Sequence, residues 1–439
     1  MDKVNKIFPV YLGACSEYNP GSVASIIEQA LSQIPLAKPI SGKIVIKPNL
    51  VMAHPKVATE SFTRKEVVEG ILQVIRKQGQ NIEKIDIVEK SGLGVTTATA
   101  FRHAGYKQLV RKYKVKLRAM EERRRSTVVL EKGQVHFHIS IAREIAERDF
   151  LVFAPKLKTN VLSHSYSGAL KLNIGTIDSK ERIYHHNYHL PVKIVDILEA
   201  ANPDLIVTDG IRLAFGGNQM TQQGIDMGVV VVSTNAVAHD MVCARLLGLD
   251  PFKIEHIVEA IRRGYGPASF DDIRIMGDFP IEKGQETCKK LDFGFFPVDR
   301  FPCNFDIRVG VPYCTGGCQG IFLDWLHMVR DRKPNRLKRF PRLTVLLGKV
   351  TGTGEAPVEA RKVLLVGDCA AASRGIKTKK IVRIKGCPPS HKRIVWDMMV
   401  HFRLFAPLVL PSLIIDGFVL YPLKKIKGWL ANLRYKSPD

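Results

Sequence analysis

The sequence contains few of the features that mark secreted, disulfide-rich or repetitive proteins. Eight cysteines in 439 residues do not make a disulfide scaffold. The first residues, MDKVNKIFPVYLGA, contain no basic region followed by an apolar run, so no signal segment is expected. Internal repeats and low-complexity tracts are also missing. We therefore expect a folded cytoplasmic protein of at least two domains, with a peripheral position on the inner face of the membrane as the alternative.

Recognisable cofactor fingerprints are missing as well. The sequence shows no flavin, nicotinamide or nickel fingerprint. The glycine-containing turn Ser91–Gly94, between a predicted strand and a predicted helix, lacks a full phosphate-binding fingerprint. A tight turn is the simpler interpretation, and the sequence leaves the electron donor or acceptor of any redox reaction open.

Acidic residues are scarce in the C-terminal quarter, which makes the charge uneven. The formal net charge is +24, and residues 330–439 contribute +17 of it, with 24 Lys/Arg against 7 Asp/Glu. A uniformly basic nucleic-acid binder would not show this distribution, so we expect no nucleic-acid partner. The partner that this charge attracts should meet the C-terminal part of the chain.

Segments with strand and helix patterns alternate along most of the chain. The short apolar runs typical of buried strands in the first half are Lys43–Lys47, Lys84–Val88, Asp149–Pro155 and Asp204–Thr208. This alternation predicts an α/β fold class, with two α/β domains whose sheets are mainly parallel. We predict a lysine-rich domain at 1–290, a second domain at 301–400 and an apolar, basic tail at 401–439.

Four cysteines of the second domain each follow a strand-like run or stand in the next turn: Cys314, Cys318, Cys369 and Cys387. The carboxyl ends of neighbouring parallel strands meet at one edge of a sheet, so these thiolates can surround one object. Four thiolates are the ligand set of a [4Fe–4S] cluster or of zinc. Glycines beside the cysteines suit a bulky cluster. We favour [4Fe–4S] and keep zinc and plain thiols as alternatives.

The sequence around these cysteines resembles the flavodoxin-like cluster domain of nickel–iron hydrogenase small subunits and of the related complex I subunit. The matching segments, in order over 305–400, are Cys314-Thr-Gly-Gly-Cys318, Gly367-Asp-Cys-Ala370 and Gly386-Cys-Pro-Pro389. One extra residue within the first pair departs from the family pattern. The resemblance implies a flavodoxin-like second domain whose cysteine-bound cluster passes single electrons. Cys303 is interpreted as a spare thiol, with a fifth ligand or a redox neighbour as the alternatives.

Lysines and polar residues at or just past predicted strand ends of the first domain form a second candidate site. They are Lys47, Asn49, Lys156, Lys158 and Lys171. Buried lysines are costly unless they meet an anion or a carboxylate, which predicts a pocket for an acidic ligand. Surface lysines on loops are the alternative.

Catalytic candidates lie in and around the same stretch. They are Lys156, Lys171, His164, Asp209 and Asp240. The loop Tyr184–His189 adds three histidines, for which contact with an anion is favoured over a bound metal. Structural roles for the two aspartates, as caps of turns and helices, are equally consistent.

The first domain resembles the uncharacterised "domain of unknown function 362" family over roughly residues 40–280. The segments that carry the resemblance are KPNL (47–50), PKLKTN (155–160), SGALKLNIG (167–175), LIVTDG (205–210), VAHDMVCARLLGLDP (237–251) and GYGP (264–267). Asn160 stands where the family commonly has histidine, and Leu172 where it commonly has asparagine. A distant similarity to the amino-terminal part of nickel-dependent lactate racemases is also visible. The family implies no particular activity.

The tail contains an uncharged run, Leu404–Ile415, followed by Asp416 and a basic segment with Trp429. A membrane-spanning helix needs about 20 predominantly apolar residues, which this segment reaches only by including two prolines and Asp416. An interfacial segment on a membrane surface is therefore favoured over a span. The alternative is a tail packed on the protein itself.

Together these patterns predict an iron–sulfur redox protein that exchanges electrons with an acidic small molecule or a redox partner protein. Two alternatives come from other classes. One is a non-redox isomerase or transferase with a structural cluster, and the other is an electron-transfer or assembly partner without a substrate of its own.

Overall fold

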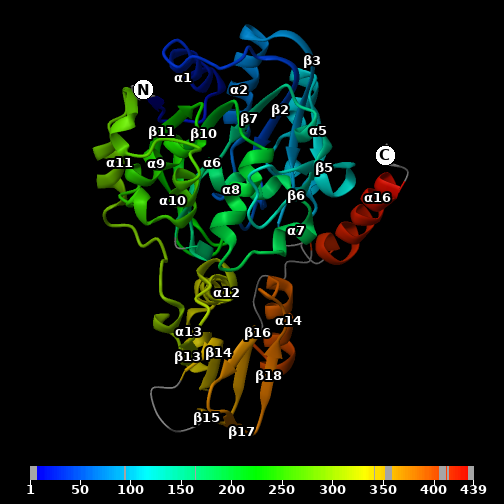
Figure 1. Ribbon diagram of the computed structural model, residues 1–439, viewed down its shortest axis with the longest axis vertical. Coiled ribbons are helices and arrows are strands. Elements are labelled where there is room, and N and C mark those ends of the chain that lie inside the picture. Colours follow the sequence, from blue (N-terminus) through cyan, green and yellow to red (C-terminus); the bar gives the residue numbers. More distant parts are fainter. Residues whose placement is uncertain are drawn as a thin grey trace.

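A computed structural model describes residues 7–92, 95–163, 165–340, 342–351, 358–404, 412 and 415–433. These residues form two separate main sheets, the larger drawn above the smaller in Figure 1, with the C-terminal helix α16 (Tyr421–Leu433) beside the larger one. The expected α/β fold class with mostly parallel sheets is confirmed.

The larger sheet has eight strands along its main path. In spatial order they are β12 (Ile273–Gly277), β1 (Phe8–Ala14), β11 (Gln223–Ser233), β10 (Leu205–Phe215), β7 (Phe150–Ala154), β2 (Ser41–Pro48), β3 (Gln80–Glu89) and β4 (Lys116–Ala119). Along this path, as far as the structure describes it, only the two pairings of β11 are antiparallel. Off this path, β8 (Lys156–Asn160) pairs with β10, and β9 (Ser165–Ser167) pairs with β8.

Helices cover both faces of this sheet, because its central strands are apolar on both sides. In β7, Leu151 and Phe153 join one hydrophobic cluster, and Phe150 and Val152 join the other. One face carries α1 (Pro20–Leu31) and α2 (Lys65–Gln78), and α3 (Thr97–His103) and α4 (Lys107–Tyr113) continue it. The other carries α6 (Ala169–Leu172), α8 (Leu190–Ala200), α9 (Ala236–Leu246), α10 (Glu255–Arg262) and α11 (Ile281–Cys288).

The smaller sheet has four parallel strands in chain order, β13 (Phe305–Val309), β14 (Leu343–Val350), β16 (Val363–Ala372) and β18 (Ile381–Ile384). α12 (Gly320–Arg332) and α14 (His391–Phe402) pack on one face. The other face holds a small cluster beside the strands β15 (Val358–Ala360) and β17 (Ile376–Thr378).

This strand order corrects the flavodoxin-like expectation for the second domain. A flavodoxin-like sheet has the order 2-1-3-4-5, whereas the strands here follow one another. In the described parts of this sheet's three crossovers, helices occur only between β13 and β14, where α12 is followed by α13 (Pro334–Arg339). The later crossovers contain β15 and β17 instead, so helices do not cover both faces.

α12 connects the two sheets. Its apolar side chains join a cluster that also contains Val57 and Val161 from the first half of the chain. The buried carboxylate of Asp324 accepts hydrogen bonds from Asn218 Nδ2 at 2.6 Å and from His391 Nε2 at 2.9 Å. The Asp324 side chain on α12 therefore links the β10–β11 connection of the larger sheet to α14 of the smaller one.

The C-terminal tail packs on the part of the molecule that contains the larger sheet. Most of Leu404–Ile415 lies outside the described residues, and the π-helical turn η8 (Asp416–Leu420) leads into α16. Buried Asp416 accepts hydrogen bonds from the Thr96 backbone N–H at 2.6 Å and from the hydroxyls of Thr96 and Thr99. Within the described ranges, no helix has the length and apolarity needed to cross a bilayer.

Candidate functional site

The four predicted cysteine ligands lie at the carboxyl ends of three parallel strands of the smaller sheet. Cys314 and Cys318 follow β13, in and beside the turn η7 (Thr315–Gln319), and Cys387 follows β18. Cys369 lies inside β16, where the pairing with β14 shifts register between Leu347 and Lys349. Cys369 therefore lies in the stretch of β16 between Val366 and Ala371 that this irregularity leaves out of the regular pairing with β14.

Two of the four thiols have a raised pKa. Burial raises the pKa of Cys314 and Cys318, and negative charge on Cys369 and Cys387 raises both further. Buried thiols of this kind stay protonated unless a cation binds beside them, since a metal ion deprotonates the thiols that coordinate it.

A glycine accommodates the sulfur of Cys318. Gly367 has a φ of +97°, and a Cβ atom there would lie 2.6 Å from Sγ of Cys318. Only glycine adopts this backbone conformation without strain and leaves this position to the sulfur. The Cys318 side chain can therefore lie directly against the backbone of β16.

Across the described ranges, no group of three or more His, Cys, Asp or Glu side chains has the geometry to hold one metal ion. A single ion draws its ligands around one point. In a [4Fe–4S] cluster each thiolate binds a different iron, so the four sulfur atoms stand further apart. The result for a single metal ion therefore does not address the wider sulfur spacing that a [4Fe–4S] cluster requires.

The predicted histidine loop contacts the cysteine loop. His186 Nδ1 lies 2.8 Å from the carbonyl oxygen of Gly316, and Asn187 Nδ2 donates to Cys387 Sγ at 3.7 Å. Burial lowers the pKa of His186 to about 3, so its imidazole is neutral at pH 7. His185 and His189 pack ring against ring, with centroids 5.3 Å apart. The loop thus positions residues beside the cysteines.

Two of the predicted ligand-binding lysines form buried ion pairs with carboxylates. Lys47 Nζ lies 2.9 Å from Glu89 Oε1, and Lys156 Nζ lies 2.9 Å from Asp209 Oδ1. Burial lowers the pKa of both lysines, and the paired carboxylates oppose this shift. Tyr18 OH also donates to Asp209. These contacts satisfy Lys47 and Lys156 within the fold.

Lys158 and Lys171 have a different environment. Lys158 Nζ donates to the Ser61 carbonyl oxygen at 3.0 Å and to Gln219 Oε1 at 3.3 Å. Burial lowers the pKa of each lysine to about 7; each lysine's proximity to other lysines adds to the shift and Asp324 opposes it. Lys156 lies just past the end of β7, as expected, and opens β8, which also contains Lys158; Lys171 lies on α6.

The other candidates have mainly structural contacts. Asp240 accepts hydrogen bonds from the backbone N–H groups of Ala169 and Leu170 at the start of α6, at 2.7 and 3.0 Å. Asp209 accepts from the Arg64 N–H. Buried Asn49 fixes the β2 end through its backbone, and its Oδ1 has no protein partner. His164 lies outside the described residues.

Two buried acidic residues of this region, Glu89 and Asp324, were not predicted from the sequence. Glu89 ends β3 beside the lysine-bearing end of β2, so the strand-end argument used for Lys47 would have found it. Asp324 is an acidic residue within the apolar helical segment Gly320–Val329, a pattern that indicates a buried partner.

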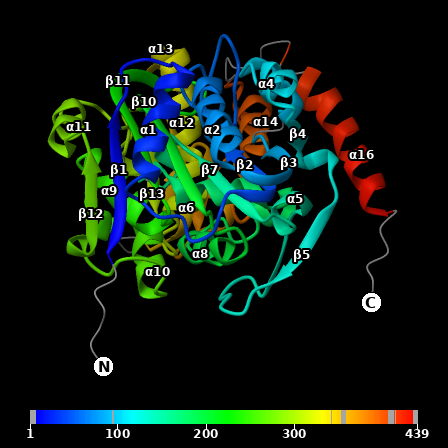
Figure 2. The ribbon, with the colours of Figure 1, turned by 90° about the horizontal axis from the view of Figure 1, so that it is seen from above.

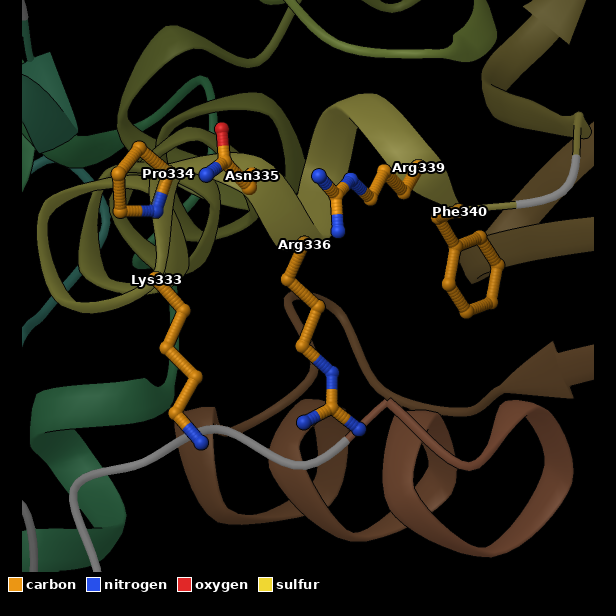
Figure 3. A pocket seen from close by; sticks show the side chains of 6 residues that line it. All are labelled: Lys333, Pro334, Asn335, Arg336, Arg339 and Phe340. Carbon is orange, nitrogen blue, oxygen red and sulfur yellow. The ribbon is translucent and has the colours of Figure 1, made fainter.

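A basic groove of about 550 Å³ lies away from the cysteines. Figure 3 shows Lys333 and Arg336 of this groove extending toward α14. Arg336 Nη2 donates to the Arg403 carbonyl oxygen at 3.1 Å. Asn304, just before β13, bonds to the Phe340 carbonyl oxygen, which places the groove near the amino-terminal end of the smaller sheet. The cysteines follow the opposite strand ends.

Comparisons with known proteins give one family match and several distant similarities. The chain is 23% identical over 295 residues to the thylakoid-associated protein sll1697 of Synechocystis sp., covering 64% of this chain and 87% of that protein. The lactate racemase apoprotein of Thermoanaerobacterium thermosaccharolyticum aligns at 12% identity with a TM-score of 0.36, covering 81% of this chain and 73% of that one. A Thermotoga maritima protein aligns at 11% and 0.30, covering 77% and 73%. Residues 44–245 match the family described as "Domain of unknown function (DUF362)", in agreement with the resemblance seen in the sequence.

Proposed function

We propose that the protein is an iron–sulfur redox protein in which Cys314, Cys318, Cys369 and Cys387 hold one [4Fe–4S] cluster. The observation that carries this proposal is the arrangement of the four cysteines in or after three parallel strands of one sheet, β13, β16 and β18. The raised pKa of Cys314 and Cys318 beside the other two thiols and the glycine that accommodates Cys318 support it. When bound, the cluster would supply one-electron transfer.

The surrounding residues would orient the cluster and control its exposure. Cys314 and Cys318 are buried, whereas Cys387 is exposed, so electrons would enter or leave on the side of Cys387. The Asn187 amide would stabilise negative charge on the Cys387 sulfur. The partner is a redox protein or an acidic small molecule, and zinc is the alternative metal.

The purified protein tests this function directly. Anaerobic purification should give a brown protein with iron and sulfide, and reduction should give an electron paramagnetic resonance signal. A protein that binds zinc, or that contains no metal after anaerobic purification, would contradict the proposal. A cluster that cannot be reduced would favour the non-redox enzyme with a structural cluster, and a reducible cluster without substrate turnover would favour the electron-transfer or assembly partner.

The same proposal includes a membrane surface as the place of action, because α16 turns its apolar side outward. Lys424 and Lys427 pair with Glu122 at 2.9 and 2.8 Å, and Gly428 packs against the backbone of Glu121. The side facing the protein is therefore polar or small. The opposite side carries exposed Leu423, Ile426, Trp429, Leu430 and Leu433.

Such a helix fits an anionic bilayer surface. Trp429 is 59% exposed, and Lys392 Nζ lies 5.5 Å from the ring centroid of the exposed Phe418. Apolar and tryptophan side chains flanked by lysines are typical of interfacial helices. The name of the thylakoid-associated relative is consistent with a membrane position. The basic groove on α13 is far from α16 in both views (Figures 1 and 2), so its charge does not contribute to this surface.

A further inference from the structure

A small cavity of about 160 Å³ lies beside the cysteine loop. Its walls come from β9, α8, the start of α10 and the residues Thr315 and Gly316 of the cysteine loop. Asn187, which donates to Cys387, also lines it. The cavity wall therefore includes Thr315, which follows the proposed ligand Cys314 in the chain, and Asn187, which contacts the proposed ligand Cys387.

Two buried polar atoms in the wall have no hydrogen-bond partner in the protein. They are Ser165 Oγ and His256 Nε2, in side chains that are 2% and 4% exposed. Buried polar groups without a partner are rare and costly, which indicates that something else meets them there. Burial lowers the pKa of His256 to about 4, so its imidazole is neutral at pH 7 and Nε2 can donate in one tautomer.

The wall offers hydrogen-bond donors and one basic side chain to a ligand. The Ser165 hydroxyl and His256 Nε2 can both donate, and Lys253 also lines the cavity. The carboxylate of Glu255 lines it too, and Asp240 acts on the pKa of His256 more strongly than Lys171 does. The apolar part of the wall consists of Leu190, Pro191, Ile194 and Ile254, which suit an alkyl group.

We infer that this cavity binds a short-chain carboxylic acid, with its carboxylate at Ser165 and His256 and its alkyl chain against α8. A water molecule occupies roughly 30 Å³ in the liquid, so the cavity holds about five water-sized groups, the size of a three- or four-carbon acid. The inference deepens the proposed function. The binding of the acid stands on the cavity itself, and only its redox role rests on the proposed cluster.

Calorimetry on the anaerobically purified full-length protein tests the cavity, with propionate as the probe and propionamide as its neutral isostere. We expect one propionate site and at least about tenfold weaker binding of propionamide, because hydrogen bonds to a charged group are the stronger ones. Ser165→Ala and His256→Leu should each weaken propionate binding about tenfold. Ser61→Ala, another buried serine whose hydroxyl has no partner, is the matched control and should leave it unchanged.

Iron content measured on the same samples separates this inference from the proposed function. Propionate binding that depends on Ser165 in a protein without iron supports the cavity and contradicts the cluster. An iron-loaded protein that does not bind propionate, or whose affinity is the same in both cavity variants, overturns the inference. Equal binding of propionate and propionamide overturns the carboxylate assignment. Thermal melting shows that each variant is folded, and the two variants give independent tests.

Discussion

Asn187 Nδ2 lies 3.7 Å from Sγ of Cys387, although 200 positions separate the two residues. The contact joins the predicted histidine loop of the larger unit to the last cysteine of the smaller sheet. A hydrogen bond to a coordinating sulfur withdraws electron density from it and raises the reduction potential of a cluster. This contact therefore links the two parts of the molecule in a way that can be measured.

The first prediction concerns this amide. Asn187→Ala should lower the reduction potential by about 20–60 mV, which corresponds to about 0.5–1.5 kcal/mol for one hydrogen bond in a one-electron couple. A redox titration followed by electron paramagnetic resonance measures the potential. Unchanged iron content must accompany the shift. An unchanged or higher potential would show that the amide does not act on the cluster.

The second prediction concerns the cysteine ligands. Cys387→Ser should sharply reduce iron and sulfide content, because hydroxyl oxygen is a poorer ligand than thiolate for these irons. Cys303→Ser is the matched control, since Cys303 is a half-buried thiol of the same region that is not among the four ligands. Full iron content in Cys387→Ser would remove Cys387 from the ligand set, and iron loss in Cys303→Ser would add Cys303 to it.

The third prediction concerns the buried pair Lys47–Glu89. Lys47→Met should destabilise the protein by about 3–5 kcal/mol, because it leaves a buried carboxylate without its charge partner. The double variant Lys47→Met/Glu89→Leu should recover part of this loss by removing the remaining charge. Denaturant unfolding measures both. A single variant as stable as the wild type would show that Lys47 is kept for ligand binding instead of stability.

The fourth prediction concerns the pH dependence of stability. Burial lowers the pKa of Lys158 from 10.5 to about 7, so between these values the unfolded chain binds one more proton than the folded one at this site. This group therefore makes stability rise with pH from about 7 toward 10.5, by up to about 1.4 kcal/mol per pH unit, and adds no pH dependence below 7.

Lys158→Met removes this contribution. From pH 7.5 to pH 8.5 the wild type should gain about 1 kcal/mol of unfolding free energy relative to the variant. The surface variant Lys289→Met, at a side chain 70% exposed, gives the baseline for the same comparison. Parallel pH profiles of wild type and Lys158→Met would contradict the lowered pKa.

The fifth prediction concerns the outward face of α16. Replacing Leu423, Ile426 and Trp429 together by serine should reduce binding to anionic liposomes at low salt at least about tenfold, because full burial of one such side chain contributes about 1.5–3 kcal/mol. Co-sedimentation measures the bound fraction. Phe137→Ser/Phe252→Ser, at exposed apolar residues of other elements, is the control. Equal recovery of all three proteins in the supernatant would show that α16 does not meet lipid.

The local patterns of the sequence were sufficient for the element types and for the placement of the cysteines. Strands and helices alternate as predicted, because hydrophobic periodicity is a local property of the chain. Cys314, Cys369 and Cys387 follow or interrupt parallel strands whose carboxyl ends point the same way. In any parallel arrangement of these strands the cysteines would lie at the same edge of the sheet. Their grouping could therefore be predicted without knowing the order of the strands.

Tertiary structure alone decided which charges pair and which helix faces are covered. Lys47 and Lys156 looked like ligand-binding residues, but Glu89 and Asp209, 42 and 53 positions away, reach them inside the sheet. The flavodoxin-like strand order was wrong for the same reason: partner strands depend on crossovers, which no local pattern encodes. The sequence predicted a basic interfacial segment around Trp429 but not the helix α16, whose polar side binds Glu122 while its apolar side faces outward. Periodicity shows that a helix has two faces, and only contacts between distant segments determine which one is buried.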